Sequence, residues 1–132
     1  MRLILLLFGT TLATLIGLLN HASETMSMDF NDCRVMVDDI AGSYEGDCSK
    51  GKAHGQGKAI GKDTYVGEFK KGYPDGQGTY TWINGNYYEG EFIKGKREGE
   101  GKMVFASVKE DSVQAGYWED DIYQGAQSSN SE

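Results

Sequence analysis

The sequence predicts an all-β protein: a meandering array of antiparallel β-hairpins in a single elongated, twisted sheet, preceded by an N-terminal signal or anchor helix. Three observations predict this fold. A glycine-and-aromatic motif recurs along the chain, side chains within each copy alternate with a period of two, and turn signals separate the alternating stretches. The copies begin at Tyr44, Tyr65, Tyr88 and, in degenerate form, Gln114, at spacings of 21, 23 and 26 residues.

The first residues are typical of an export signal. Arg2 precedes an uncharged apolar stretch over residues 3–19, after which the sequence becomes polar. Cleavage near Ser23 would remove residues 1–23 as a signal peptide and leave one small domain. The alternative is a retained membrane anchor at residues 3–19, a stretch at the short limit for a membrane span.

Residues 24–43 form a segment before the repeats and hold one of the two cysteines. The cysteines, Cys33 and Cys48, are an even count in a chain with an export signal, which favours a disulfide between them. Cys48 stands where later repeats have an aromatic residue, so the bridge would fasten the pre-repeat segment across the first hairpin as a cap. Closing this loop would raise the free energy of unfolding by roughly 3 kcal/mol in the chain-entropy model. Two reduced cysteines remain the alternative.

The glycines recur in register. Twelve of the 19 glycines have fixed positions in the first three copies, which excludes a flexible low-complexity linker. Glycine at this density would cost a helix about 1 kcal/mol per site, so the repeats are predicted to be strands. The four glycine columns are 46, 67 and 90; 51, 72 and 95; 55, 76 and 99; and 57, 78 and 101.

Alternation within each copy assigns residues to two faces of the sheet. Tyr65, Gly67 and Phe69 share one face, and Val66 and Glu68 share the other. We expect aromatic rings of one strand to cover glycines of the next, where a missing side chain exposes backbone. On the opposite face, acids and lysines can pair across strands, each pair contributing about 0.2 to 1 kcal/mol.

Two turns are predicted from local sequence. Asn84-Gly85 is typical of a two-residue type I′ hairpin turn. Residues 73–76 contain the only proline of the chain, Pro74, at a position where a turn favours its fixed φ.

The pattern Tyr-x-Gly-x4-Gly-x3-Gly-x-Gly resembles the MORN (membrane occupation and recognition nexus) repeat family. The resemblance covers residues 44–105 closely and 114–125 more weakly, because Cys48 and Gln114 depart from the aromatic positions. It implies an elongated hairpin array that contacts proteins or lipids and self-associates, and it does not imply catalysis. The predicted organisation is therefore three repeats and one degenerate repeat over residues 44–125, followed by a disordered tail at 126–132.

Candidate binding residues come from the aromatic set. Regular recurrence favours internal packing over ligand binding for most of these rings, although a concave groove could do both. Tyr73 and Tyr87 break the repeat register and are therefore better candidates for ligand contact. The full set of candidate binding residues is Tyr73, Tyr80, Trp82, Tyr87 and Phe92.

Charge and composition exclude several functions. The net charge is −7 and the acids concentrate in the flanks of the repeats, so no basic stripe for nucleic acid is present. Acids interleave with the lysines of the repeats, which favours a solvated face over a site for acidic lipid headgroups. The acid pairs at 38–39 and 120–121 lack an EF-hand loop and are interpreted as solubilising. Two thiols without a nearby histidine do not complete a zinc site.

The sequence predicts no catalytic residues, no cofactor and no metal site, because no nucleophile–base arrangement or phosphate-binding loop is present. We expect a non-enzymatic scaffold, periplasmic or secreted, that binds an unidentified protein partner, with self-association also open. The alternative is a membrane-anchored protein whose repeats contact the bilayer surface or lipid headgroups.

Overall fold

A computed structural model describes residues 33–126 of the chain. The predicted signal or anchor segment lies outside these residues, so it is not described. Within residues 33–126, no helix is long and apolar enough to cross a membrane. The elements are η1 (Asp38–Ile40), β1 (Ser43–Ser49), β2 (Lys52–Ile60), β3 (Thr64–Lys70), β4 (Tyr73–Thr81), β5 (Tyr87–Ile93), β6 (Lys96–Phe105), β7 (Ser112–Glu119) and β8 (Ile122–Gly125).

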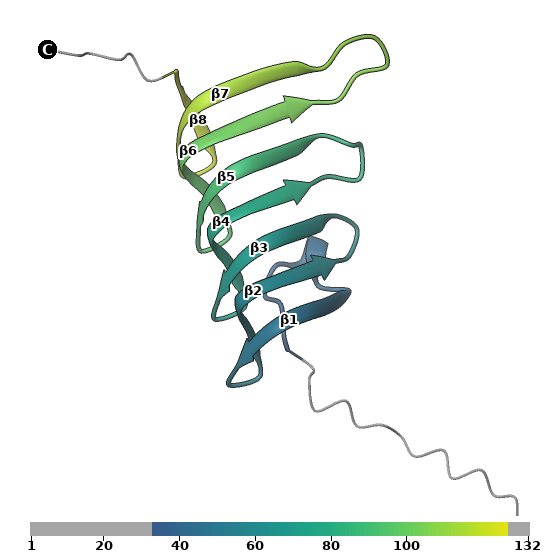
Figure 1. The fold of residues 1–132 in the computed structure, drawn as a ribbon, viewed down its shortest axis with the longest axis vertical. Coiled ribbons are helices and arrows are strands. Elements are labelled where there is room, and N and C mark those ends of the chain that lie inside the picture. Colours follow the sequence, from purple (N-terminus) through teal and green to yellow (C-terminus); the bar gives the residue numbers. More distant parts are fainter. Residues whose placement is uncertain (1–32, 127–132) are drawn as a thin grey trace, which may run out of the picture.

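The eight strands form one open sheet in chain order, and each strand pairs antiparallel with the next. The strands stack along the long axis of the molecule, with β1 at one end and the β7–β8 hairpin at the other (Figure 1). The predicted all-β meander is therefore confirmed.

A row of glycines crosses the sheet through β1 to β7. Each glycine pairs with the glycine of the next strand: Gly46, Gly57, Gly67, Gly78, Gly90, Gly101 and Gly116. A Cβ atom added at Gly57 would collide with the ring of Tyr44, and one at Gly78 would collide with the ring of Tyr65. The predicted packing of rings over glycines is confirmed.

The sheet is curved, and the register explains why. A β-bulge interrupts the pairing inside each hairpin, in β1–β2, β3–β4, β5–β6 and β7–β8. The pairings between hairpins are regular. Bulges bend strands and increase their twist, so one bulge per hairpin bends the whole array in the same sense. We call the face that carries Tyr44, Tyr65 and Tyr88 the concave face, and the opposite one the convex face.

The turn predicted at residues 73–76 is misplaced, and the turn predicted at Asn84-Gly85 is in the right place but is longer than two residues. The tight turns lie at residues 50–51, 71–72 and 94–95, where a lysine and a glycine both have positive φ. Pro74 instead lies in β4, buried opposite Phe69 at the bulge, where the ladder does not need its missing N–H. Asn84-Gly85 belongs to a five-residue connection between β4 and β5, closed by a hydrogen bond from Gly85 N–H to Trp82 O of 2.9 Å.

Candidate functional site

A column of aromatic rings runs along the concave face and links each repeat to the next. The rings meet edge to face, with centroids 5.0 to 5.2 Å apart from Tyr44 to Trp118. Edge-to-face pairs at this distance contribute about 0.5 to 1.5 kcal/mol each beyond area burial. In order, the column contains Tyr44, Phe69, Tyr65, Phe92, Tyr88, Trp118 and Tyr123.

The tyrosine hydroxyls of the column are satisfied within their own repeats. Tyr65 donates to the carbonyl of Glu68 at 3.0 Å, and Tyr88 donates to the carbonyl of Glu91 at 3.3 Å. Burial raises the pKa of both hydroxyls, that of Tyr88 to about 12. These rings are therefore neutral parts of the framework, without the properties of acid–base catalysts at physiological pH.

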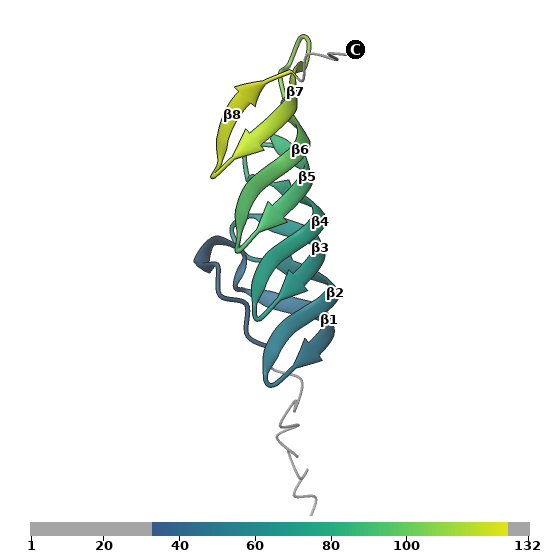
Figure 2. The ribbon, with the colours of Figure 1, turned by 90° about the vertical axis from the view of Figure 1, so that its left-hand side faces the viewer.

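The pre-repeat segment lies in an extended conformation across the hairpin tips on the concave side. Arg34 N–H donates to Gly51 O at 3.0 Å and Met36 N–H donates to Gly72 O at 2.8 Å. Since Gly51 and Gly72 are equivalent glycines of the first and second repeats, the segment passes from one repeat to the next within two residues. Val35 and Ile40 are buried against the core, with Ile40 at 0% exposure. The segment lies beside the N-terminal part of the sheet in the edge-on view (Figure 2).

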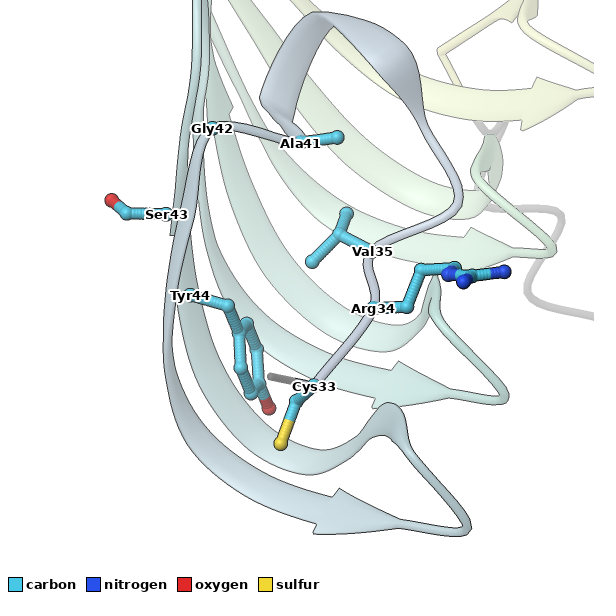
Figure 3. Close-up of a pocket in the computed structure, with 7 residues that line it drawn as sticks. All are labelled: Cys33, Arg34, Val35, Ala41, Gly42, Ser43 and Tyr44. Atoms are coloured by element: carbon cyan, nitrogen blue, oxygen red, sulfur yellow. The ribbon is translucent and has the colours of Figure 1, made fainter. Parts of the chain in front are cut away.

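A disulfide between Cys33 and Cys48 holds the start of this segment, with Cα atoms 5.7 Å apart, as predicted. Figure 3 shows Tyr44 and Val35 directed into the space between the segment and β1, and Arg34 directed away from it. The cavity that remains there has a volume of about 180 Å³. This is too small for a typical ligand pocket, so the segment acts as a cap.

The C-terminal half of the concave face is more open. Trp82, Arg97 and Tyr123 are half-buried there, and Phe105 is 37% exposed. The guanidinium of Arg97 lies 4.5 Å from the ring centroid of Trp118 and 5.7 Å from that of Trp82. Since Tyr123 also packs against Trp118, with ring centroids 5.2 Å apart, Trp82, Arg97 and Tyr123 form an apolar surface around one cation.

Arg97 is held in place by the last hairpin turn. Its Nε donates to Asp121 Oδ1 at 3.1 Å and its Nη2 donates to Asp121 O at 2.9 Å. Tyr80, at the edge of the same surface, donates to the buried carboxylate of Asp63 at 2.8 Å. Burial and this hydrogen bond to a carboxylate raise the pKa of Tyr80. The polar groups that border the surface are thus already paired, which favours a rigid binding face.

The structure divides the predicted binding residues between the two faces. Tyr80 and Trp82 lie on the open half of the concave face, and Phe92 lies beneath it in the column at 3% exposure. Tyr73 pairs with Lys70 and Tyr87 pairs with Thr81, both on the convex face. The two residues expected to be the best ligand contacts therefore lie apart from the other three.

Sequence reasoning missed Arg97 and Tyr123 as parts of the concave surface. They occupy the same repeat position, opposite Phe92 and Trp118 respectively, and the earlier repeats place Ala53 and Pro74 there. Four different residues in one column produce no periodic signal. Only the register of each hairpin identifies the position.

Comparison with known families agrees with this geometry. Residues 44–63, 65–87 and 88–107 each match the MORN repeat. The chain is a MORN-repeat protein. None of the curated proteins matches the chain. The three MORN repeats correspond to the β1–β2, β3–β4 and β5–β6 hairpins, and β7–β8 continues the same register as a fourth, divergent hairpin.

MORN repeats are generally non-catalytic binding modules. In this MORN-repeat protein, the residues that the structure describes contain no group of three or more His, Cys, Asp or Glu side chains able to hold a metal ion. The candidate site is a surface: the open half of the concave face around Trp82, Arg97 and Tyr123.

Proposed function

We propose that this MORN-repeat protein is an exported, non-enzymatic scaffold that binds a protein partner on the open half of its concave face. The observation that carries the proposal is the pre-repeat segment. It lies on the other half of the same face, in extended form, through backbone hydrogen bonds to Gly51 and Gly72 and burial of Val35. The concave face thus already holds one extended segment through backbone hydrogen bonds and a buried side chain, and a strand of a partner protein would bind in the same mode.

The chemistry of the open half suits protein contact. Binding hot spots in protein interfaces are enriched in Trp, Tyr and Arg, which are the residue types that meet at Trp82, Arg97 and Tyr123. Since Arg97 is already positioned by Asp121, binding would not have to order this long side chain, and the entropic cost is lower.

Export is supported by two features. The apolar stretch at residues 3–19 follows a basic residue, and the Cys33–Cys48 disulfide suits an oxidising compartment such as the periplasm or the extracellular space. The competing proposal is that residues 3–19 remain as an anchor and the repeats face the bilayer. Intact-mass measurement of protein from the cell envelope distinguishes the two, because a retained Met1 or Arg2 excludes cleavage and the loss of about 23 residues excludes the anchor.

A capture experiment tests the binding face. The protein is used as bait in the envelope fraction, and the partners recovered by wild type are compared with those of Trp82→Ala and Tyr87→Ala. Tyr87 is the matched control, because it is an aromatic residue of the same region on the convex face. We expect Trp82→Ala to lose the partners and Tyr87→Ala to retain them. Equal recovery by both variants would exclude the concave face as the site.

A further inference from the structure

The hairpin tips form two equivalent cavities on the convex side, and lysines surround both. The first tip site consists of Ser49, Lys50, Lys52, His54 and Lys71, around about 310 Å³. The second tip site consists of Lys70, Lys71, Tyr73, Asp75 and Lys94, around about 470 Å³. Each residue of the first site has its repeat counterpart in the second, and Lys71 belongs to both.

A recurring hydrogen bond confirms that the sites are equivalent. Lys71 N–H donates to His54 Nδ1 at 3.4 Å, and Lys94 N–H donates to Asp75 Oδ2 at 3.2 Å. In the next repeat, Asp120 N–H donates to Glu98 Oε2 at 2.9 Å. A third tip position therefore exists between the third and fourth repeats, and it has the same hydrogen bond from the turn N–H to a side chain of the preceding repeat.

At this third position the protein supplies a carboxylate of its own. Lys96 Nζ lies 2.6 Å from Asp120 Oδ1, and this hydrogen bond raises the pKa of Lys96. In the first tip site, the counterparts of Lys96 and Asp120 are Lys52 and Lys71. Two cations thus stand where the third position has an ion pair, and a carboxylate from outside would complete the arrangement.

The lysines of the two tip sites are available for such a ligand. Within residues 33–126, Lys50, Lys52, Lys70, Lys71 and Lys94 form no salt bridge, and all five are exposed. Lys50, Lys71 and Lys94 also have φ values of 53°, 53° and 49°. This left-handed conformation disfavours residues with long side chains, and glycine or asparagine would adopt it more readily. A strained position that holds lysine in three successive turns indicates a use for the charge.

We infer that the first and second tip sites bind an acidic segment of a partner protein, whose carboxylates pair with the tip lysines as Asp120 pairs with Lys96 in the third position. Successive tips are two strands apart, about 10 Å from the usual strand spacing. Because an extended chain advances about 3.3 Å per residue, a segment with acidic residues about three positions apart matches this spacing. This surface lies on the convex side of the sheet and is separate from the concave face around Trp82.

Binding of a fluorescein-labelled hexaglutamate peptide to the protein produced from the full-length chain tests the inference by fluorescence anisotropy at low salt. Wild type should bind although its own net charge is −7, because the lysines are concentrated locally. Lys71→Asn removes the shared charge and suits the left-handed backbone, and should weaken binding about tenfold. Lys109→Asn, an equal charge loss outside both tip sites, should change binding less than about twofold.

A gain-of-function variant keeps the inference testable if Lys71→Asn fails to fold, because misfolding would not increase binding. Asp120→Lys copies the turn residue of the other repeats and converts the third position into a third cationic site, so hexaglutamate should bind several-fold more tightly. No binding by wild type, equal losses in Lys71→Asn and Lys109→Asn, or no gain in Asp120→Lys would each overturn the inference. Lysine-dependent binding to phosphatidylglycerol vesicles without binding to hexaglutamate would also overturn it, in favour of a membrane ligand.

Discussion

The ring of Tyr65 meets the ring of Phe92 edge to face across the boundary between the second and third repeats, with centroids 5.1 Å apart. The same relationship joins Tyr44 to Phe69 and Tyr88 to Trp118. The first tyrosine of each of these three repeats thus contacts the aromatic residue of the following repeat. The column therefore links neighbouring repeats, which otherwise share one strand pairing.

At each end of the array, the ring that would pack against a repeat beyond that end is replaced by another residue. Cys48 replaces the aromatic residue of the first repeat, which would have no preceding tyrosine to contact. Gln114 replaces the tyrosine of the last repeat, which would have no following ring. Terminal repeats of stacked arrays are usually altered in this way, so the chain forms a finite array with capped ends.

Phe92→Ala should destabilise the protein by about 3 to 5 kcal/mol, because it opens a cavity between two buried tyrosines and uncouples the second and third repeats. Phe92 is 3% exposed. Urea unfolding followed by circular dichroism measures the change. Val108→Ala, at a fully exposed position, serves as control and should stay within about 0.5 kcal/mol. Similar stability of the two variants would contradict the role of the column.

Gly78→Ala should cost about 1 to 3 kcal/mol, because the added methyl group would occupy the space of the packed Tyr65 ring. The neighbouring Thr79→Ala changes a residue on the convex face and should cost less than about 1 kcal/mol. Chemical denaturation of both variants gives the comparison. A stable Gly78→Ala protein would show that the ring does not need to lie over the glycine.

Loss of the disulfide in a Cys33→Ser, Cys48→Ser variant should lower the free energy of unfolding by about 3 kcal/mol, as expected for a loop of 15 residues. Because the bridge holds the pre-repeat segment, the amides of Arg34 and Met36 should also exchange faster than those of β5. Hydrogen exchange measured by mass spectrometry reports this difference. Rapid alkylation of both thiols in native protein would show instead that the bridge is absent.

Stability should fall above about pH 10, because burial raises the pKa of Tyr65, Tyr80 and Tyr88 above the ordinary value near 10. The unfolded state releases these protons first, so the stabilisation is complete below pH 10 and is lost as the pH rises towards and through the folded pKa values. Urea midpoints at pH 9 and 11 test the direction. Absorbance at 295 nm should show a group of tyrosines that titrates late. Titration of all tyrosines near pH 10 in the folded protein would contradict the packing.

The fold could be predicted because its determinants are local and periodic. Tyrosine and glycine two residues apart specify the face of a strand, and repetition of the pair specifies the register between strands. The disulfide could be predicted from the even count of cysteines in a chain with an export signal, and the place of Cys48 in the repeat indicated which segments the bridge would join.

The binding surface could be predicted only in part, because it depends on where each hairpin turns. Lys71-Gly72 forms the turn that residues 73–76 were expected to form, and Tyr73 lies in β4 on the convex face. The path of the pre-repeat segment depends on hydrogen bonds to Gly51 and Gly72, 15 or more residues away in the chain. Arg97 belongs to the surface through contacts with Trp82 and Trp118 that no periodic pattern encodes.

The most direct test of the central claim is site-specific photo-crosslinking in cells. A benzoylphenylalanine residue is placed at Trp82 on the concave face or at Tyr87 on the convex face, in otherwise identical protein, and the adducts are identified by mass spectrometry. The account predicts a discrete protein adduct from position 82 and none from position 87. Adducts from position 87 alone, or only lipid adducts from position 82, would contradict a protein-binding concave face.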